Sequence, residues 1–201
     1  MSKQKPAPLP AGTVVGGYSI IKKLAAGGFG VVYLAEDDER RMVAIKEYLP
    51  ASLAGKSVLD VGAWDGFWSF EAARRGAADV LATDSFSWSG ANWGSRESFL
   101  LARRALGFEG EVRDLFIDPT ELSPEAIGGQ FDVVLFLGVM YHLEDPIGVL
   151  RRVTECPREL LVVETESTLN WLPFAAARVF PGAELNGDAT NWYQYNERAL
   201  K

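Results

Sequence analysis

The chain has 201 residues, 48 % of them hydrophobic and 23 % charged, which suits one globular domain with an attached piece and excludes a disordered chain. Its net charge of −7 is uneven, at +2 over residues 1–54 and −9 over residues 55–201, and this acidic majority argues against a nucleic-acid partner. No apolar run approaches the roughly 18 residues of a membrane span, and the polar start is unlike a signal peptide. The single Cys156 excludes a disulfide framework and a cysteine zinc cluster, so we expect a cytoplasmic protein with no membrane partner and no metal site.

Residues 12–54 form the first predicted group of elements, after a disordered tail over residues 1–11. Three short stretches of alternating apolar residues are separated by a glycine cluster and by the charged run "DDER". This pattern is typical of strands joined by short turns, so we expect a three-stranded antiparallel meander. The expected strands cover residues 18–24, 31–36 and 42–48.

Residues 55–201 follow a different pattern, in which short apolar stretches alternate with longer helical segments. Strands that alternate with helices indicate βαβ units, and hence an α/β domain with a parallel sheet. The strands are expected at residues 57–61, 79–84, 109–114, 131–137 and 159–164. The helices are expected at about residues 67–75, 96–106 and 146–156.

The meander resembles the first three strands of a bacterial serine/threonine protein kinase. "AAGGFGVVYLA" is similar to a glycine-rich phosphate loop, with Gly27, Gly28 and Gly30 in place. "VAIK" places Lys46 where a kinase lysine contacts the phosphates, although Ala25 stands where the first loop glycine is usual. Phosphoryl transfer also needs a catalytic-loop Asp and a metal-binding Asp, and no "HRD" or "DFG" follows. We expect no kinase activity; an ATP-binding, pseudokinase-like module that uses Lys46 stays open as an alternative.

"SVLDVGAWDGFWSF" is an apolar strand that leads through a glycine loop into a helix. Glycine lets the backbone approach a ligand closely, and the start of a helix presents free N–H groups. The strand ends in Asp60, and Asp65 inside the loop repels phosphates and suits a cationic ligand. The next strand ends in Asp84, where a carboxylate reaches ribose hydroxyls in such folds, and the third ends in Asp114, placed to accept from an adenine amino group.

Over about residues 52–201 the chain resembles class I S-adenosylmethionine-dependent methyltransferases, in particular the branch related to tRNA wobble-uridine methyltransferases. Four segments carry this resemblance: "GKSVLDVGAWDGFWSFEAARRGA", "ATDSFSW", "FDVVLFLGVMYHLEDP" and "FPGAELNGDATNW". It implies a Rossmann-like sheet, S-adenosyl-L-methionine as cofactor, and methyl transfer to a small molecule or to tRNA. The cofactor residues that it implies are Asp84 at the ribose, Asp114 at the adenine, and Asp60, Gly62, Ala63, Trp64, Gly66 and Gly138 around them.

The catalytic candidates follow the fourth strand of this part, in "GVMYHLEDP". Tyr141 and His142 come where the carboxyl end of the strand meets the crevice, and His142 suits removal of a proton from a hydroxyl or an amine. In the wobble-uridine branch an arginine tends to follow this pair, whereas Leu143 stands here. Together with the acidic balance, this favours a small-molecule substrate over nucleic acid.

Aromatic residues gather in two loops of the same part, "SFSWSGANWGS" and "NWYQY". Aromatic side chains on loops either stack against a flat substrate or anchor the loop to the core, and anchoring is the commoner role. The residues concerned are Trp88, Trp93, Trp192, Tyr193 and Tyr195. Arg178 is a candidate partner for a substrate carboxylate, but we expect it at the surface.

A class I methyltransferase sheet has seven strands, and this sequence ends soon after the fifth. The resemblance therefore implies a C-terminally truncated sheet whose fifth strand, residues 159–164, is an edge. An apolar edge without lysine, proline or a bulge invites pairing with the same edge of a second molecule. We expect a weak or inactive methyltransferase that forms homodimers through this edge, and a non-catalytic, self-associating protein stays open as a further alternative.

Overall fold

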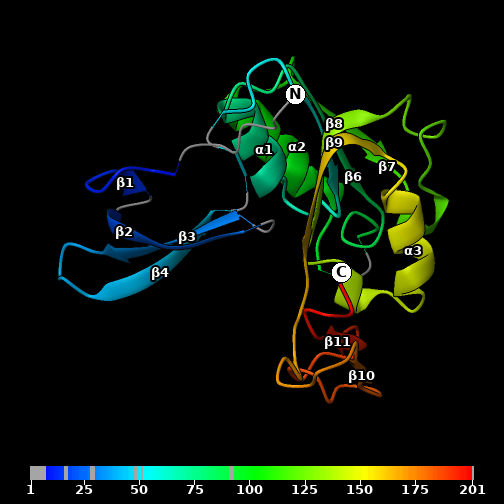
Figure 1. Ribbon diagram of the computed structural model, residues 1–201. Helices are drawn as coiled ribbons and strands as arrows, with labels where there is room; N and C mark the ends of the chain where they lie inside the picture. Colours follow the sequence, from blue (N-terminus) through cyan, green and yellow to red (C-terminus); the bar gives the residue numbers. More distant parts are fainter. Residues whose placement is uncertain are drawn as a thin grey trace. The chain divides into compact units, whose positions relative to one another are not determined.

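The computed structural model describes residues 8–15, 18–27, 30–47, 49–50, 52–90 and 93–200. The chain divides into two compact units, Met1–Leu53 and Ala54–Lys201, and Figure 1 shows the elements of each. Within the described ranges, no helix combines the length and the apolar content that a crossing of the lipid bilayer requires.

The first unit contains an antiparallel sheet with the strand order β1-β2-β3-β4. Its strands are β1 (Val14–Val15), β2 (Tyr18–Gly27), β3 (Gly30–Glu36) and β4 (Met42–Glu47). The predicted antiparallel meander is confirmed, with the short β1 added in front of it. Tyr48, the end of the predicted third strand, lies outside the described residues.

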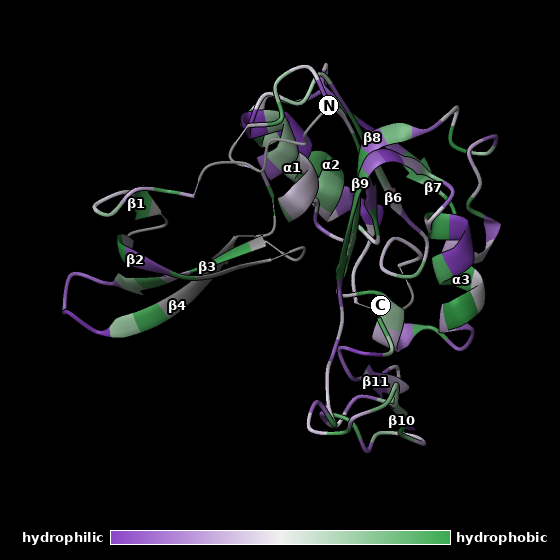
Figure 2. Ribbon diagram, in the orientation of Figure 1, coloured by the Kyte–Doolittle hydropathy of each residue, from purple (hydrophilic) through white to green (hydrophobic). Residues whose placement is uncertain are grey.

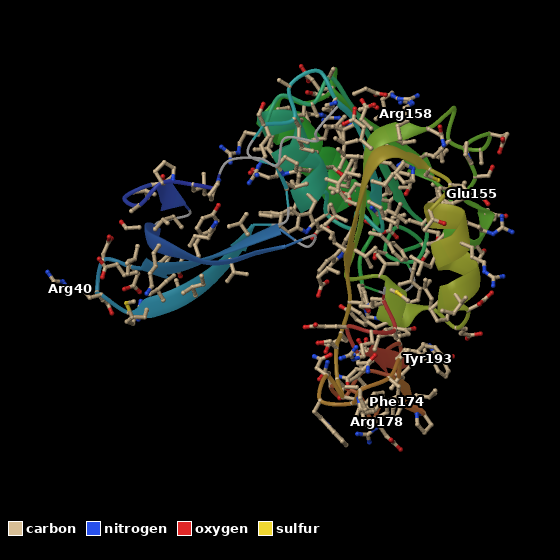
Figure 3. The ribbon with its side chains drawn as sticks, viewed as in Figure 1. Arg40, Glu155, Arg158, Phe174, Arg178 and Tyr193 are labelled. Atoms are coloured by element: carbon tan, nitrogen blue, oxygen red, sulfur yellow. The ribbon has the colours of Figure 1, made fainter. Side chains whose placement is uncertain are left out.

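The turn between β3 and β4 is held by Asp37. Its Oδ1 accepts hydrogen bonds from the backbone N–H of Glu39 at 3.0 Å and of Arg41 at 2.9 Å. Aspartate commonly stabilises tight turns in this way. Arg40, labelled in Figure 3, takes a left-handed φ of 60° at the tip. The charged run "DDER" therefore forms a turn, as its composition predicts.

The second unit is built on a parallel sheet of five strands in the order β7-β6-β5-β8-β9. The strands are β5 (Ser57–Val61), β6 (Asp79–Asp84), β7 (Val112–Phe116), β8 (Phe131–Leu137) and β9 (Pro157–Glu164). The helices are α1 (Phe67–Arg74), α2 (Arg96–Leu106) and α3 (Pro146–Val153). Figure 1 shows α1 and α2 on one side of the sheet and α3 on the other. The predicted Rossmann-like α/β fold, preceded by a small antiparallel meander, is confirmed.

Both faces of this sheet are covered, so its central strands are apolar on both sides. On one side, Leu59 of β5 lies in an apolar cluster with Val149 and Val153 of α3. On the other side, α1 and α2 pack together through the stacked rings of Phe70 and Phe99, whose centroids are 5.2 Å apart. Figure 2 shows both hydrophilic and hydrophobic residues on α3, as expected for a helix with one face on a core.

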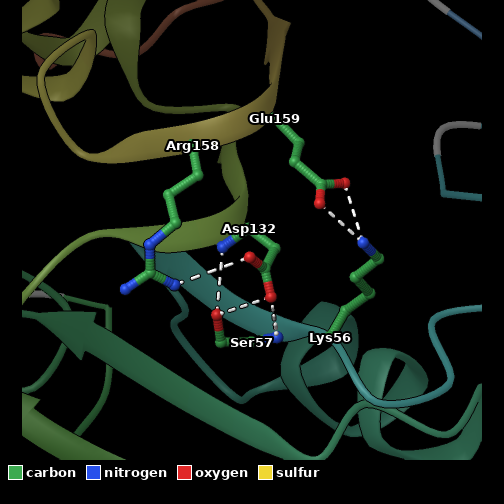
Figure 4. Close-up of polar contacts among 5 residues, drawn as sticks. All are labelled: Lys56, Ser57, Asp132, Arg158 and Glu159. Atoms are coloured by element: carbon green, nitrogen blue, oxygen red, sulfur yellow. Dashed lines mark hydrogen bonds and ion pairs between the residues drawn. The ribbon is translucent and has the colours of Figure 1, made fainter. Parts of the chain in front are cut away.

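The amino ends of β5, β8 and β9 are joined by a polar network (Figure 4). Oδ2 of Asp132 accepts from the N–H of Ser57 at 2.9 Å and from its hydroxyl at 3.0 Å, and Ser57 Oγ accepts from the N–H of Asp132 at 3.0 Å. Arg158 Nη1 lies 3.5 Å from Asp132 Oδ1, and Lys56 Nζ donates to Glu159 at 2.7 Å. These contacts align the three strands at the end of the sheet opposite their carboxyl ends.

The strands β5, β6 and β8 have the predicted bounds, whereas β7 covers Val112–Phe116 instead of residues 109–114. The turn after α2 extends further than predicted, because the N–H of Val112 donates to the carbonyl of Phe108 at 3.0 Å. β7 therefore starts later, and Asp114 lies in its middle and not at its end.

The chain after β9 returns to the carboxyl end of the sheet. In this segment β10 (Ala177–Val179) pairs with β11 (Tyr193–Tyr195) in antiparallel fashion. The N–H of Trp192 donates to the carbonyl of Tyr141 at 2.8 Å, which ties the segment to the loop that follows β8. β9 is the last strand at its side of the parallel sheet. Pairing of this edge with a second copy of the chain stays a prediction.

Candidate active site

A cavity of about 980 Å³ lies at the carboxyl ends of β5, β6 and β8. In an open α/β sheet, ligands bind where the strand order reverses. The order reverses here at β5, which has β6 on one side and β8 on the other. The walls of the cavity are the loops that follow β5, β6 and β8, the short turn after β7, and residues 189–192.

The loop between β5 and α1 holds its backbone close to the loop after β8. Gly62 has a φ of +78°, and a Cβ added there would lie 2.3 Å from Cγ2 of Val139. The N–H groups of Gly62 and Ala63 both donate to the carbonyl of Thr83, at 2.8 and 3.0 Å. Trp64 continues the loop with a left-handed φ of 48°. Gly62, Ala63 and Trp64 all line the cavity, as does Gly138 at the end of β8.

Asp84, the last residue of β6, presents a buried carboxylate to the cavity and is only 5 % exposed. Its Oδ2 accepts from the N–H of Trp64 at 2.9 Å, and its Oδ1 accepts from the N–H of Ser87 at 2.9 Å. A carboxylate oxygen has two lone pairs, so each oxygen keeps acceptor capacity for a further donor. Asp84 is therefore a fixed acceptor at the base of the site.

A second carboxylate in the cavity, Asp118, was not among the predicted residues. It lies just beyond β7, where its Oδ1 accepts from the N–H of Thr120 at 2.9 Å and its Oδ2 from the hydroxyl of Ser85 at 3.0 Å. Burial raises the pKa of Asp118, but these hydrogen bonds outweigh it and the net pKa is lowered. The sequence feature that indicates this residue is "DPT", in which the aspartate caps a short helix that begins at the proline.

Asp114, predicted to face the adenine, does not line the cavity. It lies within β7 and its side chain is turned toward α2, where Oδ1 accepts from Arg103 Nη1 at 2.7 Å and Oδ2 contacts Arg96. The shift of β7 along the sequence explains this, because the residue expected at the strand end is an interior one. The assignment of Asp114 to the adenine has no support from its position.

Asp60 and Gly66, also predicted at the cofactor, lie beside the cavity and not in its wall. Neighbouring residues of a strand face opposite sides of the sheet. Asp60 accordingly faces α1, where its Oδ2 accepts from the hydroxyl of Ser69 at 2.6 Å, and it is 2 % exposed. Gly66 begins α1 with a φ of +86°, and a Cβ there would lie 2.6 Å from Phe70 and 2.7 Å from Phe99. Gly66 is thus required by packing.

Asp60 is expected to make the stability of the protein depend on pH. Burial raises its pKa to about 6, and the nearby charge of Asp84 adds to the rise. The folded state holds the proton of Asp60 more tightly than the unfolded state does. The contribution of Asp60 to the free energy of unfolding is therefore fully present below about pH 4 and is lost as the pH rises through about 6. The variant Asp60→Asn should lose this dependence and gain up to about 3 kcal/mol in unfolding free energy at pH 7.5.

Urea unfolding of both proteins between pH 4 and pH 8 measures this effect. Asp79→Asn is the control, because Asp79 lies on the neighbouring strand, its side chain is 42 % exposed, and it pairs with Arg113. An Asp60→Asn protein that keeps the same slope of stability against pH would contradict the assignment.

The catalytic candidates Tyr141 and His142 both line the cavity, from a short 3₁₀ helix over Met140–His142. Nδ1 of His142 lies 3.1 Å from both the carbonyl oxygen and the hydroxyl of Thr190. Its ring contacts Trp93 edge-on, with centroids 4.8 Å apart. Burial lowers the pKa of His142 below its ordinary value, so the neutral imidazole is favoured at pH 7. Burial raises the pKa of Tyr141, and nearby carboxylates add to the effect.

The aromatic loops divide between the two predicted roles. Trp93 and Trp192 line the cavity. Trp88 instead anchors its loop, because it is 5 % exposed and its Nε1 donates to the carbonyl of Trp64 at 2.7 Å. Tyr195 is buried in the cluster against α3. Arg178, labelled in Figure 3, is exposed on β10 with its guanidinium 4.5 Å from the centre of the Phe180 ring.

The charge of the cavity has one sign. Apart from Tyr141 and His142, the ionisable side chains of its wall are all acidic, and no lysine or arginine occurs among the described lining residues. The acidic residues are Asp65, Asp84, Asp118, Glu144 and Asp145. A ligand that carries positive charge is therefore favoured over an anion.

The strand order, the ligand-sized cavity at the switch point and the buried acid at the end of β6 are those of a Rossmann-like, class I methyltransferase fold. The match to a family model agrees: the chain belongs to the methyltransferase domain family, whose model covers residues 34–198. This match begins within β3, so it includes part of the first unit as well as nearly all of the second.

Two curated relatives show how far the similarity extends. The tRNA U34 carboxymethyltransferase of Pseudomonas aeruginosa is 34 % identical over 128 residues, which are 60 % of this chain and 37 % of that one. The ubiquinone biosynthesis O-methyltransferase of Pseudomonas paraeruginosa is 38 % identical over 102 residues, which are 50 % of this chain and 39 % of that one. The chain thus spans well under half the length of the curated relatives that it matches.

Among solved structures, the chain is similar to a Burkholderia thailandensis 1,6-didemethyltoxoflavin-N1-methyltransferase with bound 1,6-didemethyltoxoflavin and S-adenosylhomocysteine. The TM-score is 0.51 at 20 % identity, over 73 % of this chain and 57 % of that one. This similarity concerns the fold.

Proposed function

We propose that the chain binds S-adenosyl-L-methionine in the cavity and transfers its methyl group to a small molecule. The observation that carries this proposal is Asp84, a buried carboxylate at the end of β6. Both of its oxygens are fixed by backbone N–H groups and both keep a lone pair, which suits the two hydroxyls of a ribose. The neighbouring Trp64 and Gly62 supply the backbone wall against which a nucleoside lies.

The remaining carboxylates fit the charge of this cofactor. S-adenosylmethionine carries a sulfonium and an ammonium group, and the acidic wall contains no competing cation among its described residues. We assign the adenine side to Asp118 in place of Asp114, because Asp118 lines the cavity and Asp114 is bound by arginines.

The chemistry requires alignment of two groups in one cavity. When bound, the cofactor supplies a methyl carbon whose bond to sulfur breaks, leaving the electron pair on sulfur, as a lone pair of the acceptor forms the new bond. The chain contributes the position of both molecules and the removal of the acceptor proton. We assign Tyr141 and His142 to the acceptor, because both line the cavity just beyond the end of β8.

A small, uncharged or cationic acceptor fits this cavity better than tRNA. The curated relatives named tRNA U34 carboxymethyltransferases act on tRNA, whose phosphates are bound by lysine and arginine. Here Leu143 follows His142, and the described wall of the cavity is acidic and aromatic. Trp93 and Trp192 line the cavity, and aromatic side chains suit contact with a flat molecule.

For the first unit we propose a kinase-like meander without kinase activity. β2 to β4 form the antiparallel hairpins that the resemblance implies, and Lys46 lies in β4. Transfer of a phosphoryl group needs acidic residues that follow these strands in a kinase, and the sequence after Lys46 contains no such motif.

Calorimetric titration of the chain with S-adenosylhomocysteine and with ATP tests both proposals. We expect saturable binding of S-adenosylhomocysteine, no saturable heat with ATP, and the same S-adenosylhomocysteine affinity in Lys46→Met. Absence of S-adenosylhomocysteine binding would contradict the methyltransferase proposal. ATP binding that disappears in Lys46→Met would favour a nucleotide-binding module instead.

A further inference from the structure

His142 is connected by hydrogen bonds to two polar residues of the C-terminal segment, Thr190 and Asp188. Its Nδ1 lies 3.1 Å from both the carbonyl oxygen and the Oγ1 of Thr190. The hydroxyl of Thr190 in turn donates to Oδ1 of Asp188 at 2.7 Å, and the N–H of Thr190 donates to the same oxygen at 2.8 Å. These hydrogen bonds therefore connect Asp188 to Thr190 and Thr190 to His142.

The direction of these hydrogen bonds determines the tautomer of His142. A carboxylate can only accept, so the proton of the Thr190 hydroxyl points to Asp188 and the hydroxyl oxygen faces His142 as an acceptor. The carbonyl oxygen of Thr190 is also an acceptor. Since both partners of Nδ1 accept, Nδ1 must donate, and the neutral ring carries its proton on Nδ1.

The other ring nitrogen, Nε2, is then the basic atom. Within the described part of the chain, Nε2 has no hydrogen-bond partner, and the ring lines the cavity. The charged group that faces the ring from the C-terminal segment is Asp188, and Tyr141 is beside it on the same turn. A free lone pair on a ring that lines the cavity is what a general base requires.

We propose that Asp188 and Thr190 are positioning residues that hold His142 with its proton on Nδ1, and that the acceptor is an aromatic molecule with a hydroxyl or amine nucleophile. This rests on the proposed methyl transfer. An acceptor that gains a methyl group on oxygen or nitrogen must lose a proton, and that proton passes to Nε2. The imidazolium so formed is stabilised by Asp188 through Thr190 and returns the proton to solvent.

The acceptor class follows from the same atoms. A nucleophile that carries no proton, such as a carboxylate, needs no base and would meet an acidic wall. A hydroxyl or an amine can donate its hydrogen to Nε2 before it reacts. The indole of Trp93 lies edge-on to the His142 ring and lines the same cavity, so an aromatic acceptor beside His142 would have an aromatic neighbour.

His142 is the only histidine of the chain, so ¹⁵N NMR of a histidine-labelled protein reports it without assignment. At pH 8 we expect a protonated Nδ1 and an unprotonated Nε2, the reverse of the form preferred by histidine in water. Asp188→Ala leaves the Thr190 carbonyl as an acceptor for Nδ1 but frees the Thr190 hydroxyl to donate to the same nitrogen. Part of the population should therefore move to the tautomer with the proton on Nε2, and both resonances should shift. Thr190→Ser keeps the hydroxyl and should retain the wild-type spectrum.

A matched pair of probes tests the acceptor class in the presence of S-adenosylhomocysteine. 4-Methylphenol should shift the Nε2 resonance, whereas 4-methylanisole, which has the same ring without the phenolic proton, should not. A wild-type spectrum with the proton on Nε2, an unchanged spectrum in Asp188→Ala, or equal responses to the two probes would overturn the proposal. Calorimetry with S-adenosylhomocysteine on the same sample shows separately whether the methyltransferase proposal has failed.

Discussion

Replacement of Asp84 by alanine is expected to weaken the binding of S-adenosylhomocysteine by about 1–3 kcal/mol, or about 5- to 150-fold in Kd. The change removes a charged acceptor that is buried in the wall of the cavity. It also leaves the N–H groups of Trp64 and Ser87 without their partner, so the loop that lines the site loses its fixed position. Asp84→Asn keeps one acceptor oxygen and should weaken binding less.

Calorimetry at constant ionic strength measures the change, and Asp79→Asn is the matched control. Asp79 is an aspartate at the opposite end of the same strand, where it is paired with Arg113 at the surface. Its replacement should leave the affinity unchanged. If Asp84→Ala and Asp79→Asn bound S-adenosylhomocysteine equally well while both were folded, Asp84 would have no role in the site.

Gly66→Ala is expected to lower the unfolding free energy of the second unit by about 2–5 kcal/mol. Two costs combine at this position. The φ of +86° is unfavourable for any residue with a Cβ, at about 1–2 kcal/mol. The Cβ would also lie 2.6–2.7 Å from the buried rings of Phe70 and Phe99, and overpacking of this kind costs about 1–3 kcal/mol.

Gly107→Ala separates these two costs. Gly107 ends α2 with a φ of +74°, but a Cβ there would meet nothing within 4 Å. Its replacement should therefore cost only the backbone part, about 1–2 kcal/mol in urea unfolding. Equal losses in the two variants would show that the rings of Phe70 and Phe99 move aside and that Gly66 is not a packing requirement.

The sheet was predictable from sequence where apolar runs are sharply bounded. β5, β6 and β8 are such runs, and their ends agree with the structure. β7 was misplaced because residues 109–111 read as the start of a strand, whereas they belong to a hydrogen-bonded turn after α2. That shift carried Asp114 into the predicted site in place of Asp118.

The wall of the cavity was predictable only in part. The wall positions of Gly62, Trp64 and Asp84 were predictable, because these residues lie at or just beyond the ends of strands. The orientation of the Asp60 side chain was not predictable. β5 is buried on both faces, so its sequence pattern does not indicate whether Asp60 faces α1 or the cavity. The contact of Thr190 with His142 joins residues 48 positions apart, and nothing local to "GDATNW" indicates it.

The tryptophans make the cavity optically distinctive. Four of the six in the chain, Trp64, Trp68, Trp93 and Trp192, line it. Trp88 is buried, and Trp171 is 80 % exposed in the C-terminal segment. Indole emission changes when a ligand alters the polarity around the ring, and most of the indole rings of this protein lie where a ligand enters. Binding of unlabelled compounds can therefore be followed directly in the emission spectrum, and candidate acceptors can be screened before any methylated product is known.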